Sequence, residues 1–128
     1  MLVDDDDVIN LVHSEVIKRI IPDVHLKVFK SGNQLIHYFN SDPDAHMDVM
    51  FLDIRMPEMD GFEVLDKLSK QDHSFYDGAN IYVLSSTLDE RDLQRANDNP
   101  LVTGFISKPL SFDTIRNILA NNAKSNPQ

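Results

Sequence analysis

The chain has 128 residues, enough for one compact domain and too few for a second of ordinary size. It is 41% hydrophobic and 26% charged, a composition typical of a globular protein, and it contains no cysteine, which excludes disulfides and thiolate chemistry. A formal net charge of −9 argues against direct contact with nucleic acid. No apolar run is long enough to span a membrane, so we expect a cytoplasmic protein.

Strand-like and helix-like segments alternate along the chain. In order they are a strand at 1–3, a helix at 8–21, a strand at 26–29, a helix around 35–39, a strand at 49–52, a helix around 62–68, a strand at 81–84, a helix at 89–97, a strand at 102–107 and a helix around 112–119. Such alternation predicts a parallel sheet with helices on both faces. Residues 71–80 form a polar connection of unusual length, and 121–128 are expected to be a frayed tail.

Polar side chains follow four of the five predicted strands. They are Asp4 and Asp5 after the first, Asp53 after the third, Ser85 after the fourth and Lys108 after the fifth. The carboxyl ends of parallel strands share one edge of a sheet, where ligands bind. Three neighbouring carboxylates repel one another, and a hard divalent cation with oxygen ligands, best Mg²⁺, relieves that repulsion. An aspartate beside such an ion is a competent nucleophile that would form an aspartyl phosphate.

Four segments resemble receiver domains of two-component systems, and the resemblance covers nearly the whole chain. They are LVDDD at 2–6, FLDIRMPEMDG at 51–61, VLSS at 83–86 and ISKPL at 106–110. The resemblance implies an α/β fold over residues 1–128 as one domain: a five-stranded parallel sheet in order 2-1-3-4-5 flanked by five helices, the flavodoxin-like receiver fold.

The same resemblance implies a role for individual residues. Asp53 is the expected phosphoacceptor, and Ser85 and Lys108 complete the catalytic set. The expected Mg²⁺ ligands are Asp4, Asp5, Asp53 and the backbone carbonyl of Arg55. Ser85 and Phe105 are the expected switch residues, although Phe105 is equally compatible with a plain core aromatic. Lys108-Pro109 is expected to be a cis peptide.

The function that this implies is a phosphoacceptor switch. Asp53 would take a phosphoryl group from a histidine kinase or phosphotransfer protein, and the fourth helix, fifth strand and last helix would change their surface to control a downstream protein. The chain would be no enzyme beyond catalysing its own phosphorylation and dephosphorylation, and it would be a monomer or a phosphorylation-dependent dimer.

Three alternatives stay open. The first is a receiver-like interaction module that works without phosphorylation. The second is a Mg²⁺-dependent phosphohydrolase with an aspartyl nucleophile, although such enzymes commonly carry an acid where this chain has Arg55. The third is a flavodoxin-like electron carrier, in which the aspartates at 4–7 would repel a cofactor phosphate.

Other polar residues have structural explanations. Asp6 and Asp7 suit the N-terminus of the first helix, and Asp60 suits the N-cap of the third. The five histidines lack ligand-like spacing, and we expect them at the surface.

Overall fold

The computed structural model describes residues 1–42, 44–71 and 76–124, which form a five-stranded parallel sheet and five helices. The elements are β1 (Leu2–Val3), α1 (Asp7–Ile20), β2 (Val28–Phe29), α2 (Gly32–Ser41), β3 (Val49–Asp53), α3 (Gly61–Ser69), β4 (Asn80–Ser85), α4 (Glu90–Asp98), β5 (Gly104–Ser107) and α5 (Phe112–Lys124). The strand order is β2-β1-β3-β4-β5 with every pairing parallel, which confirms the predicted fold class.

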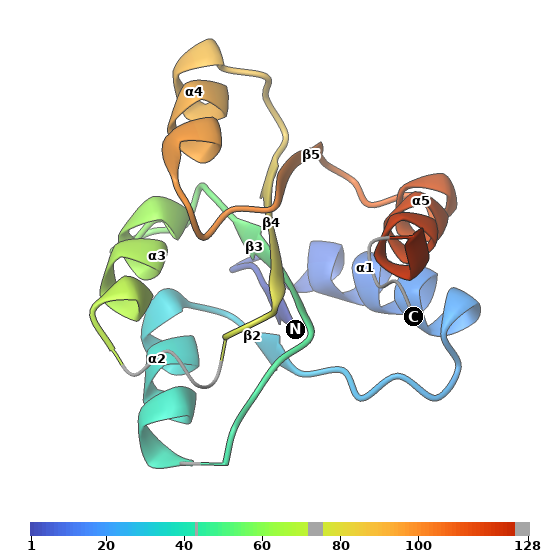
Figure 1. Ribbon diagram of the computed structural model, residues 1–128, viewed down its shortest axis with the longest axis horizontal. Coiled ribbons are helices and arrows are strands. Elements are labelled where there is room, and N and C mark those ends of the chain that lie inside the picture. The colour runs from blue at the N-terminus through green and yellow to red at the C-terminus, as the bar shows by residue number, and fades with distance from the viewer. Residues whose placement is uncertain (43, 72–75, 125–128) are drawn as a thin grey trace.

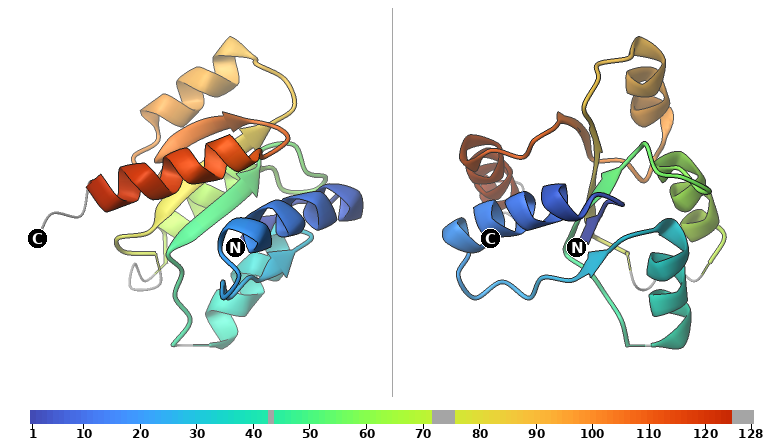
Figure 2. Two further views of the ribbon diagram at one scale, coloured as in Figure 1. Left: turned by 90° about the vertical axis from the view of Figure 1, so that its right-hand side faces the viewer. Right: turned by 180° about the vertical axis from the view of Figure 1, so that it is seen from behind.

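Two layers of helices cover the sheet, with α1 and α5 on one face and α2, α3 and α4 on the other (Figures 1 and 2). Successive side chains of β3 go to opposite faces. Met50 and Leu52 join the core cluster that contains residues of α2 and α3, whereas Phe51 stacks on Tyr82 in the cluster that contains residues of α1 and α5. The continuous apolar run before Asp53 is therefore a strand buried on both faces.

Several element boundaries differ from the prediction. β2 has two residues because β1 offers only Leu2 and Val3 to pair with it. β5 begins at Gly104 and not at residue 102 as predicted. The N–H of Ile81 donates to the side-chain hydroxyl of Thr103, where a longer strand would offer a backbone carbonyl as the acceptor.

The predicted frayed end does not begin at residue 121, because α5 continues to Lys124. Ala120 and Ala123 favour this continuation, since alanine is the best helix former. Residues 125–128 lie outside the described residues, as do 72–75 of the long connection. In the described part of that connection Tyr76 is buried, so the segment is less polar in its packing than predicted. In the described part of the chain, no helix is both long and apolar enough to cross a bilayer.

Side-chain caps fix where several helices begin, α1 and α3 among them. Asp6 accepts hydrogen bonds from the N–H groups of Val8 and Ile9 at the start of α1. Asp60 accepts the N–H of Glu63, whose side chain accepts the N–H of Asp60, so α3 begins with a capping box. Both caps were predicted, and they set the direction in which the chain leaves β1 and the loop after β3.

The buried face of α1 includes two polar residues. Asn10 and His13 are buried together with Ile17, whereas the apolar Val12 is 42% exposed. The surface prediction is therefore wrong for His13, whose side chain is 1% exposed. His25, His37 and His46 are exposed as expected, and His73 lies outside the described residues.

His13 connects α1 to the loop between β5 and α5. Its Nε2 accepts a hydrogen bond of 3.0 Å from the backbone N–H of Leu110. Burial lowers the pKa of His13, Asp4 partly opposes this, and Lys108 lowers it further. The ring is therefore held neutral, which an acceptor nitrogen requires.

We expect His13 to make stability depend on pH. Because its pKa is lower in the folded than in the unfolded chain, the unfolded chain takes up the proton first as the pH falls. The contribution of the neutral His13 ring to the unfolding free energy is therefore complete above about pH 6.5 and is lost as the pH falls below that value. Urea titrations should show a smaller loss of unfolding free energy for His13→Gln than for the wild-type protein between about pH 7.5 and about pH 5. Equal losses would contradict a buried neutral imidazole.

The close approach of α3 to the end of β3 requires Gly61. Its N–H donates to the carbonyl of Ile54 at 2.9 Å, and a Cβ here would lie 2.7 Å from the carbonyl oxygen of Asp53. We expect Gly61→Ala to lower the unfolding free energy by roughly 1–3 kcal/mol. Lys67→Ala, on the exposed side of the same helix, is the control and should change it by less than about 0.5 kcal/mol. If the two variants are equally stable in urea, the contact is less tight than described.

Candidate functional site

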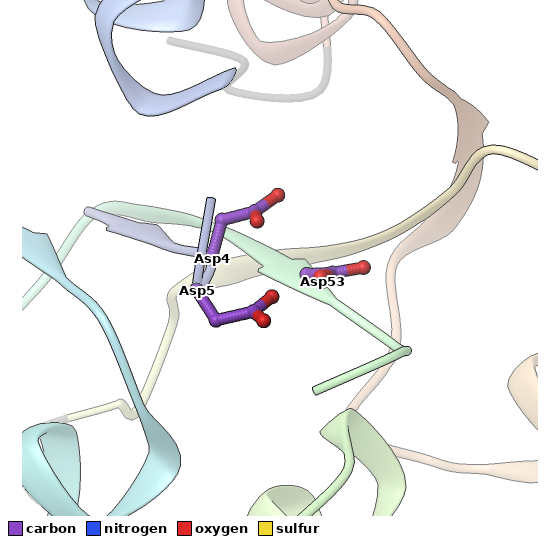
Figure 3. A group of neighbouring side chains, drawn as sticks. All are labelled: Asp4, Asp5 and Asp53. Atoms are coloured by element: carbon purple, nitrogen blue, oxygen red, sulfur yellow. The ribbon is translucent and has the colours of Figure 1, made fainter. Parts of the chain in front are cut away.

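Three carboxylates meet where β1 and β3 end. Asp4 and Asp5 follow β1, and Asp53 is the last residue of β3. Each offers an oxygen within 4.8 Å of the others, and Figure 3 shows the three side chains as one group. Asp4 and Asp53 are each 3% exposed, whereas Asp5 is exposed. The group is therefore anchored in the protein and open to solvent on the side of Asp5.

Asp4 is oriented by contacts on both its side chain and its backbone. Its Oδ1 accepts the N–H of Asp6 at 3.0 Å, and its carbonyl accepts a hydrogen bond of 2.8 Å from the buried amide of Asn10. Asn10 was not predicted to contact the site. The available signal was its spacing. His13 and Ile17 follow Asn10 by three and seven positions, which places all three on one face of the helix.

Lys108 neutralises two of the three carboxylates. Its Nζ lies 2.6 Å from Oδ2 of Asp4 and 3.1 Å from Oδ1 of Asp53, and the side chain is 12% exposed. The backbone N–H of Lys108 donates to the carbonyl of Ser85 at 2.8 Å, which ties it to the end of β4. Burial by itself lowers the pKa of Lys108, but its contacts with Asp4 and Asp53 outweigh burial and leave the pKa above its ordinary value. The side chain is therefore an ammonium ion.

Asp53 carries an energetic cost when it is ionised. Burial and then repulsion by Asp4 raise its pKa to about 6, although Lys108 and the N–H of Arg55, 3.1 Å from Oδ1, act in the opposite direction. Additional positive charge close to Asp53 would remove this cost, because it favours the ionised carboxylate.

Ser85 and Phe105 lie on the strands that continue the sheet from β3. Ser85 is fully buried at the end of β4, and its Oγ accepts the N–H of Thr87 at 3.1 Å. Phe105 pairs with Val83 in the β4–β5 register and is half-buried against the core cluster that includes Ala96 of α4. The predicted peptide between Lys108 and Pro109 is cis.

The side chain of Arg55 pairs with a carboxylate of α4. Its Nη2 lies 2.5 Å from Oδ2 of Asp92, whose side chain is 6% exposed. This ion pair was not predicted from the sequence. Within α4 the buried residues are Asp92 and Ala96, whereas the apolar Leu93 is 41% exposed.

The donor set fits a small, hard divalent cation. Asp4, Asp5 and Asp53 offer only carboxylate oxygens, and the backbone of Arg55 adjoins Asp53. Mg²⁺ binds through one or two carboxylates and keeps several waters, which a group open on one side permits. The same edge holds an ammonium and a buried hydroxyl, the groups that bind phosphoryl oxygens.

The chain matches a known protein family and a solved structure with the same fold. The sequence matches the response regulator receiver domain over residues 1–120. The crystal structure of a two-component response regulator from Cytophaga hutchinsonii superposes with a TM-score of 0.86 and 28% identity, covering 98% of this chain and 95% of that one.

Two curated relatives are longer than this chain. Hybrid signal transduction histidine kinase L of Dictyostelium discoideum is 28% identical over 98% of the chain, which spans 7% of that kinase. The probable methanogenesis regulatory protein FilR2 of Methanothrix harundinacea is 32% identical over 53% of the chain, a match spanning 42% of that protein. The family match, the strand order and the acidic group agree: the chain belongs to the response regulator receiver domains, the phosphoacceptor modules of two-component signalling.

Proposed function

We propose that Asp53 accepts a phosphoryl group, in a Mg²⁺-dependent reaction, from a histidine kinase or phosphotransfer protein. The observation that carries this proposal is the position of Asp53, a buried carboxylate that adjoins Asp4 and Asp5 and lies 3.1 Å from the ammonium of Lys108. Negative charge alone would repel a phosphodonor. The ammonium and a cation held by the carboxylates reverse that effect.

The residues divide the chemistry among them. An oxygen of Asp53 forms the bond to phosphorus while the bond to the histidine nitrogen of the donor breaks. Lys108 and Ser85 bind the other phosphoryl oxygens through their ammonium and hydroxyl groups. A bound Mg²⁺, held by the carboxylates and the carbonyl of Arg55, would neutralise charge on the transferred group. The protein would catalyse only its own phosphorylation and dephosphorylation.

The output surface is formed by α4, β5 and α5. A phosphoryl group on Asp53 draws Ser85 and Lys108 toward it, and space vacated by Ser85 allows Phe105 to turn inward. Half-burial of Phe105 supports this role, because a fully packed ring would lack a second position. The change shifts an existing equilibrium and alters the surface that a downstream protein, or a second copy of the domain, recognises.

Phosphorylation is tested directly by intact mass. Incubation with Mg²⁺ and acetyl phosphate or phosphoramidate should add the mass of one phosphoryl group to the wild-type protein. The gain should be absent without Mg²⁺ and absent in Asp53→Asn. Asp48→Asn removes an exposed carboxylate just before β3 and should retain the gain. No gain in the wild-type protein, with Mg²⁺ still bound, would instead indicate a receiver-like module that signals without phosphate.

The raised pKa of Asp53 predicts that neutralising this residue stabilises the metal-free protein. The folded state holds the proton up to about pH 6, whereas the unfolded chain releases it near 3.8, so stability falls as the pH rises between these values. Two pKa units correspond to about 3 kcal/mol, which is the upper limit of the expected gain for Asp53→Asn at neutral pH. Urea titrations in chelator should show this gain shrinking toward pH 4, where both states are protonated. If Asp53→Asn is no more stable than the wild-type protein at neutral pH, ionised Asp53 does not carry the energetic cost described above.

A further inference from the structure

Helix α4 is held in place by few apolar contacts. The structure describes all nine of its residues, and of these Asp92 and Ala96 are buried while Leu93 is 41% exposed. It lies at the periphery of the molecule beside β5 (Figure 1). The guanidinium of Arg95 lies over the ring of Phe62 in α3, at 4.1 Å from the centroid. The position of α4 therefore depends on charged side chains more than that of a helix with a buried apolar stripe.

The most buried of these charged groups is Asp92. Its Oδ2 lies 2.5 Å from Nη2 of Arg55, and the same nitrogen lies 4.0 Å from Oδ2 of Asp89. A buried carboxylate that loses its cationic partner destabilises the structure strongly. The described position of α4 is consequently stabilised by the guanidinium of Arg55 beside Asp92.

Arg55 also contacts the acidic site. Its backbone N–H donates to Oδ1 of Asp53 at 3.1 Å, so one residue touches the carboxylate of β3 with its backbone and the carboxylate of α4 with its side chain. The Arg55 side chain is 59% exposed, which leaves it free to change partner. A phosphoryl group on Asp53 brings close to two negative charges and three acceptor oxygens, and arginine binds such oxygens in pairs.

We infer that Asp92 and a phosphoryl group on Asp53 compete for the guanidinium of Arg55, and that this competition links the charge of Asp53 to the position of α4. The inference rests on the proposed role of Asp53 as the phosphoacceptor. Asp92 is a positioning residue, because it touches no reacting atom and acts through Arg55. When Arg55 turns to the phosphoryl group, Asp92 is left buried without its cation, and α4 moves until that carboxylate reaches water.

The coupling is reciprocal, so removing the charge of Asp92 strengthens binding at Asp53. The probe is Mg²⁺ with trifluoroberyllate, which imitates a phosphoryl group on a carboxylate, titrated by fluorine NMR. Asp92→Asn should bind it roughly tenfold more tightly than the wild-type protein, within the range usual for coupled sites. Glu90→Gln removes an exposed carboxylate from the same helix and should leave the affinity unchanged. An unchanged affinity in Asp92→Asn overturns the inference.

A double-mutant cycle tests whether the effect passes through Arg55. In the Arg55→Gln background, Asp92→Asn should have no further effect on trifluoroberyllate affinity, because no guanidinium remains to compete for. An effect of the same size in that background would show that Asp92 acts by loosening the helix in general, and it would overturn the competition.

A measurement on the unmodified protein decides the question if Asp92→Asn does not fold. Hydrogen exchange of the backbone amides at 90–98 should quicken when trifluoroberyllate and Mg²⁺ bind, while amides of α3 stay protected. Binding without any change in α4 overturns this inference and leaves the proposed function standing. A wild-type protein that binds no trifluoroberyllate overturns the proposed function itself, and this inference with it.

Discussion

Asp4 and Asp53 cannot move apart, because they lie at the ends of neighbouring strands whose backbones are joined by the pairings of Leu2 with Phe51 and Val3 with Leu52. The repulsion between the two carboxylates is therefore relieved either by a proton on Asp53 or by positive charge brought close to them. Lys108 supplies part of that charge from the end of β5. A site built in this way favours ligands that add a cation, and the fold maintains this preference without any conformational change.

The helices around this fixed edge are attached in different ways. His13 of α1 bonds to the backbone just before α5, and these two helices share a core cluster with the sheet. Residues of α2 and α3 pack through leucine, phenylalanine and valine side chains. α4 depends instead on contacts made by arginine side chains. Apolar packing responds little to a change of charge, whereas an ion pair responds directly, so the polar helix α4 is the element best suited to respond to Asp53.

The features that could be predicted from the sequence are those with a local signature. Asp53 and Ser85 each follow an apolar run, which marks the end of a strand, and Lys108 follows the short strand that contains Phe105 and Ile106. Asp6 and Asp60 precede helical patterns, which marks a cap. The strand order has no local signature, and it came from the resemblance to a family.

The features that could not be predicted depend on how elements meet. Val8, Leu11 and Val12 make α1 look apolar on a face that the fold leaves exposed, while Asn10 and His13 turn inward. Composition cannot show this rotation, because the loops and the sheet determine which side of a helix faces the core. The ion pair between Arg55 and Asp92 joins residues 37 positions apart, and each of them resembles an ordinary surface charge in the sequence.

The shortness of β2 has a consequence for the behaviour of the protein at high concentration. β2 is an outer strand of the sheet and contains only Val28 and Phe29, and the exposed Lys27 and Lys30 flank it. A second molecule would find few free backbone groups there and would have to bring its own strand against two lysines. Such an edge is a poor template for intermolecular strand pairing, which protects this side of the sheet from aggregation.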